Sequence, residues 1–282
     1  MPVITRRLTR TCKSNTKGGR KPKQTPASSL KQFENKIYGG RGWKWFCGTG
    51  WLLAMLLSCW AAPRIYHRLI FHFPAAQKED WDQTLAEKER ELSSRWHDSR
   101  PLIILAGDSQ IELGDWYDFF GGAWAMRNCG LSRAKIADVT RLVSAIGDSR
   151  PKMVVLMCGI NSLGGHESLD SCLHDYEDLL LAVRAHLQPE SILVLSVMPV
   201  RESAADRASH QFNAEINEFN TKLAACCRQH QVDFLNVNPA VADTNGGLAA
   251  ELTVDGLHLN REGYRRLARL MAAQLAPMTQ LP

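Results

Sequence analysis

Two short segments of the chain hold the residue types that an acyl-transfer site needs. Ser109 closes the segment Gly107-Asp108-Ser109, and Asp255 stands three residues before His258 near the C-terminus. A serine hydroxyl is a weak nucleophile, so it needs a neutral imidazole to accept its proton, and that imidazole needs an acceptor on its other nitrogen. We therefore expect Ser109 as nucleophile, His258 as base and Asp255 as the group that orients the base, in a hydrolase or acyl-transfer reaction.

Attack on an ester creates an oxyanion that needs hydrogen-bond donors, and two further residues could supply them. Asn161, in Gly159-Ile160-Asn161, offers a side-chain amide, and Gly130 offers a backbone N–H with no side chain in front of it. We expect these donors to converge with the backbone N–H of Ser109 on the oxyanion. Taken singly, each residue is as typical of a turn or a helix cap as of catalysis. The hypothesis therefore depends on the ordered set.

Apolar runs of strand length recur from residue 102 onward, with helical patterns between them. The five predicted strands are residues 102–106, 124–129, 153–158, 192–198 and 232–237. Helical patterns cover residues 136–146, 173–187 and 212–230, and a closing helix contains Tyr264, Leu267, Leu270 and Met271. Near-continuous apolar strands separated by helices predict an α/β fold with a parallel sheet covered on both faces.

The candidate residues fall at one edge of this predicted sheet. Ser109 follows the first strand, Gly130 the second and Asn161 the third, while Asp255 and His258 precede the closing helix. Open parallel sheets bind ligands beyond the carboxyl ends of their strands, at a switch in strand order. The strands thus predict one site rather than scattered polar residues.

Charge is divided unevenly along the chain. Residues 1–44 hold 12 of the 34 Lys and Arg residues and one of the 29 acidic residues, so the remainder carries 22 basic and 28 acidic residues. The basic excess lies in a segment without a stacking motif or a nucleic-acid-binding signature. We therefore expect no nucleic-acid partner, and we predict that residues 1–44 form a basic, flexible tail.

Residues 45–62 run for 18 residues without a charge, which is the short end of what spans a bilayer. With the basic tail before it, this segment predicts a single-pass signal anchor with the N-terminus cytoplasmic and the remainder periplasmic or extracellular. A cleaved signal peptide, a lipoprotein signal ending at Cys59 and a buried core helix remain open as alternatives. The membrane is the partner that this segment predicts.

The remaining chain divides into a linker, residues 63–99, and a catalytic domain, residues 100–282. Residues 79–98 of the linker have the pattern of an amphipathic helix, which could pack on the domain or serve as a stalk. The eight cysteines include no CxxC pair and no Cys/His spacing suited to zinc. We therefore expect no metal and no disulfide framework.

Four segments, in chain order, resemble the conserved blocks of the SGNH/GDSL hydrolase family. The segments are Gly107-Asp108-Ser109-Gln110, Asn128-Cys129-Gly130-Leu131-Ser132, Gly159-Ile160-Asn161-Ser162 and Asp255-Gly256-Leu257-His258. The resemblance covers about residues 100–276. It implies a three-layer, flavodoxin-like fold whose five-stranded parallel sheet has the order 2-1-3-4-5, and ester hydrolysis without a metal or another cofactor.

Two residues depart from the pattern that many members of this family show. Ser162 follows Asn161 where many have aspartate, which we expect to affect loop support. Arg133 stands where many have glycine, and we expect its side chain to point to solvent rather than to an anionic substrate.

Aromatic residues in the loop after Ser109 could wall an acyl or sugar pocket, as could residues 163–166 after Asn161. The aromatic residues are Trp116, Tyr117, Phe119 and Phe120. We expect at least two of them to pack under the edge of the sheet instead.

Together these features predict a membrane-anchored serine esterase that acts on acyl esters, acetyl esters among them. Its substrate would be a small-molecule, lipid or glycan ester. The same machinery could pass the acyl group to a sugar hydroxyl, so an O-acyltransferase or O-acetyl esterase acting on cell-envelope polysaccharide is an alternative. A non-catalytic anchored scaffold that keeps the fold is another alternative.

Overall fold

The computed structural model of the chain describes residues 76–94, 98–120, 122, 124–202 and 207–275. The predicted tail, residues 1–44, and the predicted membrane segment, residues 45–62, lie outside the described residues, as does the first part of the linker. Among the helices of the described ranges, none has the length and apolar character needed to cross a bilayer.

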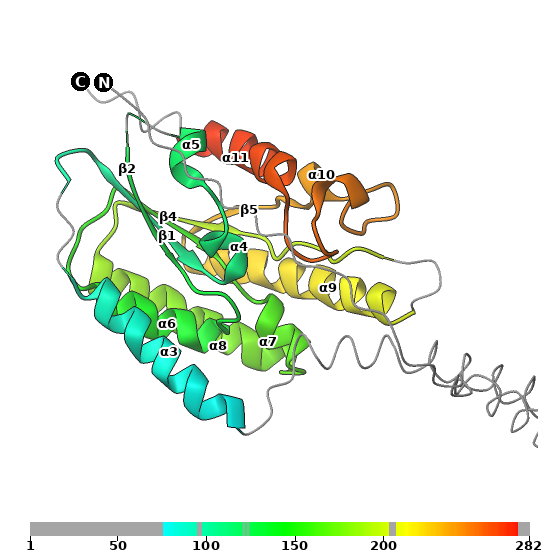
Figure 1. Ribbon diagram of the computed structural model, residues 1–282, viewed down its shortest axis with the longest axis horizontal. Coiled ribbons are helices and arrows are strands. Elements are labelled where there is room, and N and C mark those ends of the chain that lie inside the picture. The colour runs from blue at the N-terminus through cyan, green and yellow to red at the C-terminus, as the bar shows by residue number, and fades with distance from the viewer. Residues whose placement is uncertain (1–75, 95–97, 121, 123, 203–206, 276–282) are drawn as a thin grey trace, which may run out of the picture. The chain divides into compact units, whose positions relative to one another are not determined.

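Five parallel strands form a single sheet in the order β2-β1-β3-β4-β5, as the family resemblance implied (Figure 1). The strands are β1 (Leu102–Gly107), β2 (Ala125–Gly130), β3 (Met153–Met157), β4 (Ser191–Leu195) and β5 (Asp233–Leu235). Gly107 at the end of β1 pairs with Gly130 on one side and Met157 on the other. The carboxyl ends of β1, β2 and β3 therefore lie together. Ser109 and Asn161 follow β1 and β3, and Gly130 is the last residue of β2.

The fourth predicted strand, residues 192–198, is longer than β4. The backbone N–H and C=O of Val197 both bond to the side-chain amide of Asn220, each at 2.8 Å. Because this amide takes the place of a neighbouring strand, the chain leaves the sheet while staying buried and apolar.

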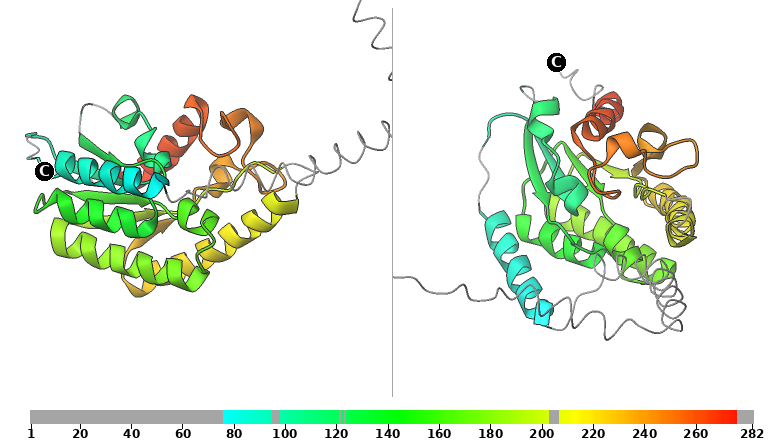
Figure 2. Two further views of the ribbon diagram at one scale, coloured as in Figure 1. Left: turned by 60° about the horizontal axis from the view of Figure 1, so that its bottom comes forward. Right: turned by 45° about the vertical axis from the view of Figure 1, so that its right-hand side comes forward.

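Helices cover both faces of the sheet and give three layers, as Figures 1 and 2 show. One face carries α3 (Ala76–Leu92), α6 (Ile136–Ile146), α8 (Leu169–Ala182) with its π-helical extension (Val183–Leu187), and α9 (Arg207–Gln229). The other face carries α5 (Trp116–Phe120), α10 (Asn238–Val241), a 3-10 turn (Ala250–Leu252) and α11 (Arg261–Leu275). Two short helices, α4 (Ser109–Glu112) and α7 (Ile160–Gly164), begin just beyond β1 and β3.

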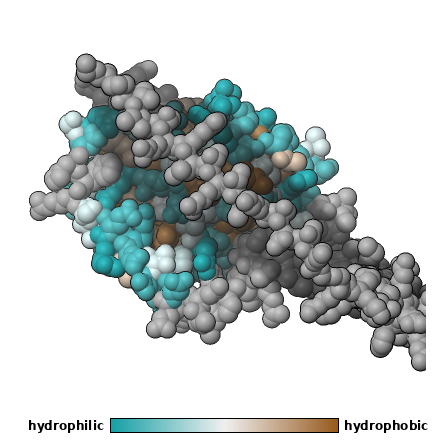
Figure 3. Space-filling model, viewed as in Figure 1, coloured by the Kyte–Doolittle hydropathy of each residue, from teal (hydrophilic) through white to brown (hydrophobic). Residues whose placement is uncertain are grey.

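The core has two halves, one on each face of the sheet. Along β1, Ile104 and Ala106 pack toward α3, α6, α8 and α9, while Ile103 and Leu105 pack toward α5 and α11. Successive side chains of a strand point to opposite faces, so an unbroken apolar run is what a doubly covered strand requires. The visible described surface in Figure 3 is mostly hydrophilic, in keeping with apolar residues gathered inside.

Helix α3 packs on the domain, which is one of the two roles that its amphipathic pattern allowed. Leu85 and Leu92 are fully buried in the first half of the core. The buried guanidinium of Arg127, on β2, donates to the carbonyl of Leu92 at 2.6 Å and so caps the helix. Arg141 on α6 pairs with Glu89 at 3.0 Å. The α/β unit therefore begins before residue 100.

The aromatic residues after Ser109 belong mainly to the core. Trp116 is buried, donates from Nε1 to the carbonyl of Ile111 at 2.7 Å and meets the ring of Tyr264 edge-on. Phe119 and Phe120 pack against the same half of the core. Tyr117 is exposed. Packing under the sheet edge is thus confirmed for three of the four.

Candidate active site

The nucleophile candidate lies where β1 passes directly into α4. A Cβ on Gly107 would lie 2.0 Å from the carbonyl oxygen of Met157, so only glycine allows the last residue of β1 to approach β3 this closely. Asp108 then caps α4, because its Oδ1 accepts from the N–H of Gln110 at 2.9 Å. Ser109 becomes the first residue of α4, with only 6% of its surface exposed.

A tight turn between the 3-10 turn and α11 presents the histidine. Asp255 Oδ1 accepts from the backbone N–H groups of Leu257 and His258, at 2.9 and 2.8 Å. Gly256 has a φ of 93°, a backbone conformation that favours glycine. The hydroxyl of Thr253 donates to the carbonyl of His258 at 2.7 Å and closes the turn. The Asp-Gly signal in the sequence therefore produces a turn whose aspartate keeps its second oxygen available.

The structure brings Ser109, His258 and Asp255 into one hydrogen-bonded line. Ser109 Oγ lies 2.9 Å from His258 Nε2, and His258 Nδ1 lies 2.7 Å from Asp255 Oδ2. A carboxylate can only accept, so the partner of Nδ1 assigns the proton to that nitrogen and leaves Nε2 as the acceptor for the serine hydroxyl. This tautomer is the one that a general base beside a serine requires.

Electrostatics favour an ionised Asp255. Partial burial alone would raise the pKa of this carboxyl, but the hydrogen bonds from the His258 N–H, the His258 ring and the Leu257 N–H outweigh it and lower the pKa of Asp255. A negative charge at Asp255 stabilises the imidazolium that forms when His258 takes a proton. The arrangement can therefore abstract a proton from Ser109 and return it to a leaving group.

Asp108, directly before the serine, has the opposite environment. Its side chain is almost fully buried, and burial raises the pKa of Asp108 to about 7, although the N–H of Gln110 and the charge of His258 both lower it. The neutral carboxyl can still cap α4, because its carbonyl oxygen can accept the hydrogen bond from the N–H of Gln110. Burial therefore raises the pKa of Asp108, whereas hydrogen bonds lower the pKa of Asp255.

Asn161 lies in the first turn of α7, at the same sheet edge. Its Nδ2 donates to the carbonyl oxygen of Ala134 at 3.0 Å. A side-chain amide carries two N–H donors, so this bond fixes the orientation of the group and leaves the second donor for another acceptor. It also ties α7 to the loop after β2.

Gly130 differs from the expectation. Its N–H donates to Asn128 Oδ1 at 3.0 Å, so in this structure the donor faces Asn128 rather than an oxyanion. The need for glycine comes from packing, because a Cβ at Gly130 would lie 2.4 Å from the backbone nitrogen of Glu112 in α4. The missing side chain makes room for the nucleophile's helix.

The loop after β2 explains the two departures from the family pattern. Arg133 has a φ of 74°, a conformation that glycine adopts at lower cost, which accounts for the glycine in many relatives. Its guanidinium lies 5.6 Å from the ring centre of Trp81 on α3. Ser162 accepts from the backbone N–H of Ile136 at 3.3 Å and so supports the start of α6.

Two further residues join the serine to the histidine turn and were not predicted to do so. Gln110 Nε2 donates to the carbonyl of Leu257 at 2.8 Å, and the hydroxyl of Tyr264 on α11 donates to the carbonyl of Gln110 at 3.0 Å. These bonds fix the distance between the nucleophile's helix and the turn that carries His258. Partners this far apart in the chain leave no signal in one sequence.

Potential metal ligands gather elsewhere in the described part of the chain. The one group of three His, Cys, Asp or Glu side chains that could hold an ion there is Glu177, Cys226 and His230, none of which belongs to the segments above.

Comparison with known protein families shows which family the chain matches. The sequence model described as the GDSL-like lipase/acylhydrolase family matches residues 105–266, which is more than half of the chain. That range includes Ser109, Asn161, Asp255 and His258.

Curated relatives include the platelet-activating factor acetylhydrolase IB subunit alpha1 of Rattus norvegicus. It is 27% identical over 192 residues, which cover 63% of this chain and 76% of the relative. The Homo sapiens protein of the same name is 26% identical over 192 residues, covering 63% of this chain and 77% of the relative.

Solved structures share the fold. A provisionally assigned platelet activating factor from Streptococcus pneumoniae superposes with a TM-score of 0.62 at 23% identity, covering 72% of this chain and 100% of that one. A GDSL-like lipase from Bacteroides thetaiotaomicron gives a TM-score of 0.55 at 20% identity, covering 70% and 97%. At these identities the similarity concerns the fold.

Proposed function

We propose that Ser109 is the nucleophile of this chain, His258 the general base and Asp255 its orienting partner. The chain belongs to the GDSL-like lipase/acylhydrolase family and is an ester hydrolase of that type. The observation that carries this proposal is the continuous line from Ser109 Oγ through the ring of His258 to Asp255, with contacts of 2.9 and 2.7 Å. The line joins residues from two distant segments at the edge of the sheet where such folds bind ligands.

The reaction follows from the proton positions in this line. Ser109 Oγ forms a bond to the ester carbonyl carbon while its proton passes to His258 Nε2, and the carbonyl electron pair moves to the oxygen. The bond to the alcohol then breaks, and the alcohol takes the proton from Nε2. Water next attacks the acyl-enzyme and gives a proton to Nε2. His258 returns that proton to Ser109 as the carboxylic acid leaves.

Two donors are proposed for the oxyanion. The backbone N–H of Ser109 is in the first turn of α4, where no intrahelical acceptor exists, and Asn161 has a second amide hydrogen beyond the one that Ala134 holds. Gly130 is left out of this pair because Asn128 holds its N–H. Loss of an oxyanion donor costs about a hundredfold or more in turnover, which sets the effect that Asn161→Ala would have.

Replacement of Ser109 by alanine tests the proposed nucleophile. Ser109→Ala should lower the hydrolysis of a short aryl ester by at least about a thousandfold, because no other group in the line can form the acyl-enzyme. Ser144→Ala, on the exposed face of α6, is the matched control and should keep wild-type turnover. Wild-type turnover in Ser109→Ala would refute the assignment.

We further propose that short acyl groups, acetyl among them, are the preferred acyl part of the substrate. This proposal is supported by the curated relatives, which carry the name of an acetylhydrolase. Turnover of one alcohol esterified with acyl chains of graded length measures the preference. A maximum at acetyl or propionyl supports the proposal, and a maximum at long chains contradicts it.

We also propose that residues 1–44 form a cytoplasmic tail, residues 45–62 a membrane anchor and residues 63–99 a connection that ends in α3, with the catalytic domain outside the cytoplasm. Support comes from the sequence alone, in the uncharged run of 18 residues and the basic excess before it. Such an anchor would keep the esterase near envelope lipids and glycans.

A further inference from the structure

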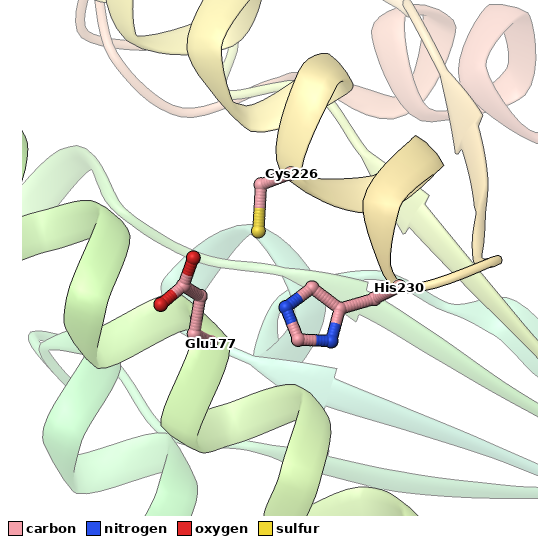
Figure 4. A group of neighbouring side chains, drawn as sticks. All are labelled: Glu177, Cys226 and His230. Carbon is pink, nitrogen blue, oxygen red and sulfur yellow. The ribbon is translucent and has the colours of Figure 1, made fainter.

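Three side chains with metal-binding atoms meet between α8 and α9. Glu177 comes from α8, Cys226 from the last turns of α9, and His230 is the residue after α9 ends. In Figure 4 the sulfur of Cys226 points into the space between the carboxylate of Glu177 and the imidazole of His230. One ligand atom from each of the three lies within 4.8 Å of the other two.

The helices themselves create this group. Cys226 and His230 are four residues apart, and the N–H of His230 donates to the carbonyl of Cys226 at 3.0 Å, so the helical turn continues through His230. Residues four apart lie on the same helix face, which here is the face that packs beside α8. Arg184 donates to the backbone carbonyl of His230 and holds this end of the helix without using the imidazole.

The three side chains form no hydrogen bond or ion pair with each other or with the rest of the described structure. Within the described ranges, neither the carboxylate of Glu177, the thiol of Cys226 nor the ring of His230 takes part in a hydrogen bond or an ion pair. Cys226 is 5% exposed, so its sulfur is shielded from solvent where it faces the other two side chains. Three ligand atoms around one space form a set that a divalent cation binds at once.

We propose that Glu177, Cys226 and His230 bind one zinc ion, or a divalent cation of similar softness, that joins α8 to α9. Carboxylate, thiolate and imidazole are all zinc ligands, with bond lengths of roughly 2.0 to 2.3 Å. A tetrahedral ion with such bonds needs ligand atoms about 3.5 Å apart, which rotation of the glutamate and histidine side chains can supply. A thiolate and an imidazole disfavour magnesium and calcium. Water would fill the fourth position, and the Cys226 proton would pass to solvent.

The site lies away from the ester chemistry. α9 runs antiparallel to the strands and ends just before β5 begins, so its last residues lie at the amino edge of the sheet, opposite the edge that carries Ser109. The ion would therefore stabilise the pairing of two helices and take no part in ester hydrolysis. The four-residue spacing of Cys226 and His230 does not identify a site in the sequence, because the third ligand comes from a separate helix.

Metal titration of the purified whole chain tests the proposal. Zinc added in competition with a chromophoric chelator should bind at one equivalent, and cobalt in its place should give the charge-transfer absorption of a thiolate ligand. Cys226→Ser should abolish that absorption, and Cys226→Ser and His230→Gln should each weaken zinc binding at least about tenfold. His174→Gln, an exposed histidine on α8, should bind zinc as wild type does.

Thermal unfolding gives a second readout that does not depend on the cobalt spectrum. Zinc should raise the Tm of the wild-type chain and of His174→Gln, because the ion binds only the folded state, and should leave the Tm of Glu177→Gln unchanged. This variant replaces a partly exposed side chain by one of equal size, so it tests the site even where Cys226→Ser fails to fold. Absence of zinc binding by the wild-type chain, or equal binding by Glu177→Gln, would overturn the proposal.

Discussion

Asp255 divides its two carboxylate oxygens between the backbone of its own turn and the ring of His258. Oδ1 accepts from the N–H groups of Leu257 and His258, while Oδ2 accepts from His258 Nδ1. One residue thus shapes the turn and selects the tautomer. The short spacing between Asp255 and His258 suffices for this because the turn folds the carboxylate back onto the ring.

Asp255→Asn should separate these two roles. The amide keeps an oxygen for the backbone but can place an N–H against Nδ1, which favours the wrong tautomer, so kcat should fall by roughly 10³- to 10⁴-fold. Steady-state hydrolysis of a short aryl ester measures the effect. Asp243→Asn is the matched control, since Asp243 also accepts from backbone N–H groups in a turn but has no ring to orient. Similar losses in both variants would contradict the assigned role.

Asp108 makes stability depend on pH. Its folded pKa of about 7 lies above the ordinary aspartate pKa of 3.8, so the folded state holds a proton that the unfolded state releases between these pH values. The stabilisation is complete below about pH 3.8 and is lost as the pH rises toward 7. Each pKa unit corresponds to about 1.4 kcal/mol, so the loss is on the order of a few kcal/mol.

Asp108→Asn should remove this dependence, because the amide keeps an oxygen for the N–H of Gln110 but does not titrate. Urea unfolding at several pH values between 4 and 7 gives the free energy of unfolding for both proteins. The wild type should lose more stability than Asp108→Asn as the pH rises. Parallel curves for the two proteins would show that Asp108 does not titrate in this range.

Among the elements, α3 has the clearest test. Leu85 is fully buried between α3 and the domain, so Leu85→Ala should lower the free energy of unfolding by about 2–5 kcal/mol. Leu181→Ala, at a leucine that is 55% exposed on α8, should change it by less than about 0.5 kcal/mol. Urea unfolding measures both. If α3 served only as a stalk, the two substitutions would have equally small effects.

Long periodic elements could be predicted from the sequence, and the reason is visible in α6. Its buried residues are Ile136, Val139, Leu142, Val143 and Ile146, whose spacings of three and four residues mark one helix face within the predicted range 136–146. The strands behave likewise, because burial on both faces requires unbroken apolar runs. Their order followed from the family resemblance and not from periodicity.

Short elements and distant contacts could not be predicted in this way. α4 and α7 are too short to show a period, and Gln110 reaches Leu257 through a contact that only the folded chain creates. Gly130 shows the same limit. Its position in the sequence predicted a backbone N–H available to an oxyanion, whereas in the fold this N–H donates to Asn128 Oδ1. Side-chain partners depend on tertiary structure, which local patterns do not encode.

We propose that the whole chain is attached to a membrane through a segment that precedes its α/β unit. If residues 45–62 span the bilayer, the whole chain should remain with membranes after an alkaline carbonate wash and be released by detergent. A chain that lacks residues 1–62 should appear in the supernatant and hydrolyse esters, because α3, the sheet and the Ser109–His258–Asp255 line all belong to residues 76–275. Recovery of the whole chain in the carbonate supernatant would contradict the anchor.

Covalent labelling of the folded protein tests the proposed nucleophile most directly. A fluorophosphonate should modify one residue, and peptide mass spectrometry should place the adduct on Ser109, since only this hydroxyl faces His258 Nε2 at 2.9 Å within the described structure. Labelling should slow strongly in His258→Ala, where the base is missing. An adduct on another serine, or unchanged labelling in His258→Ala, would contradict the account of a Ser109 nucleophile activated by His258.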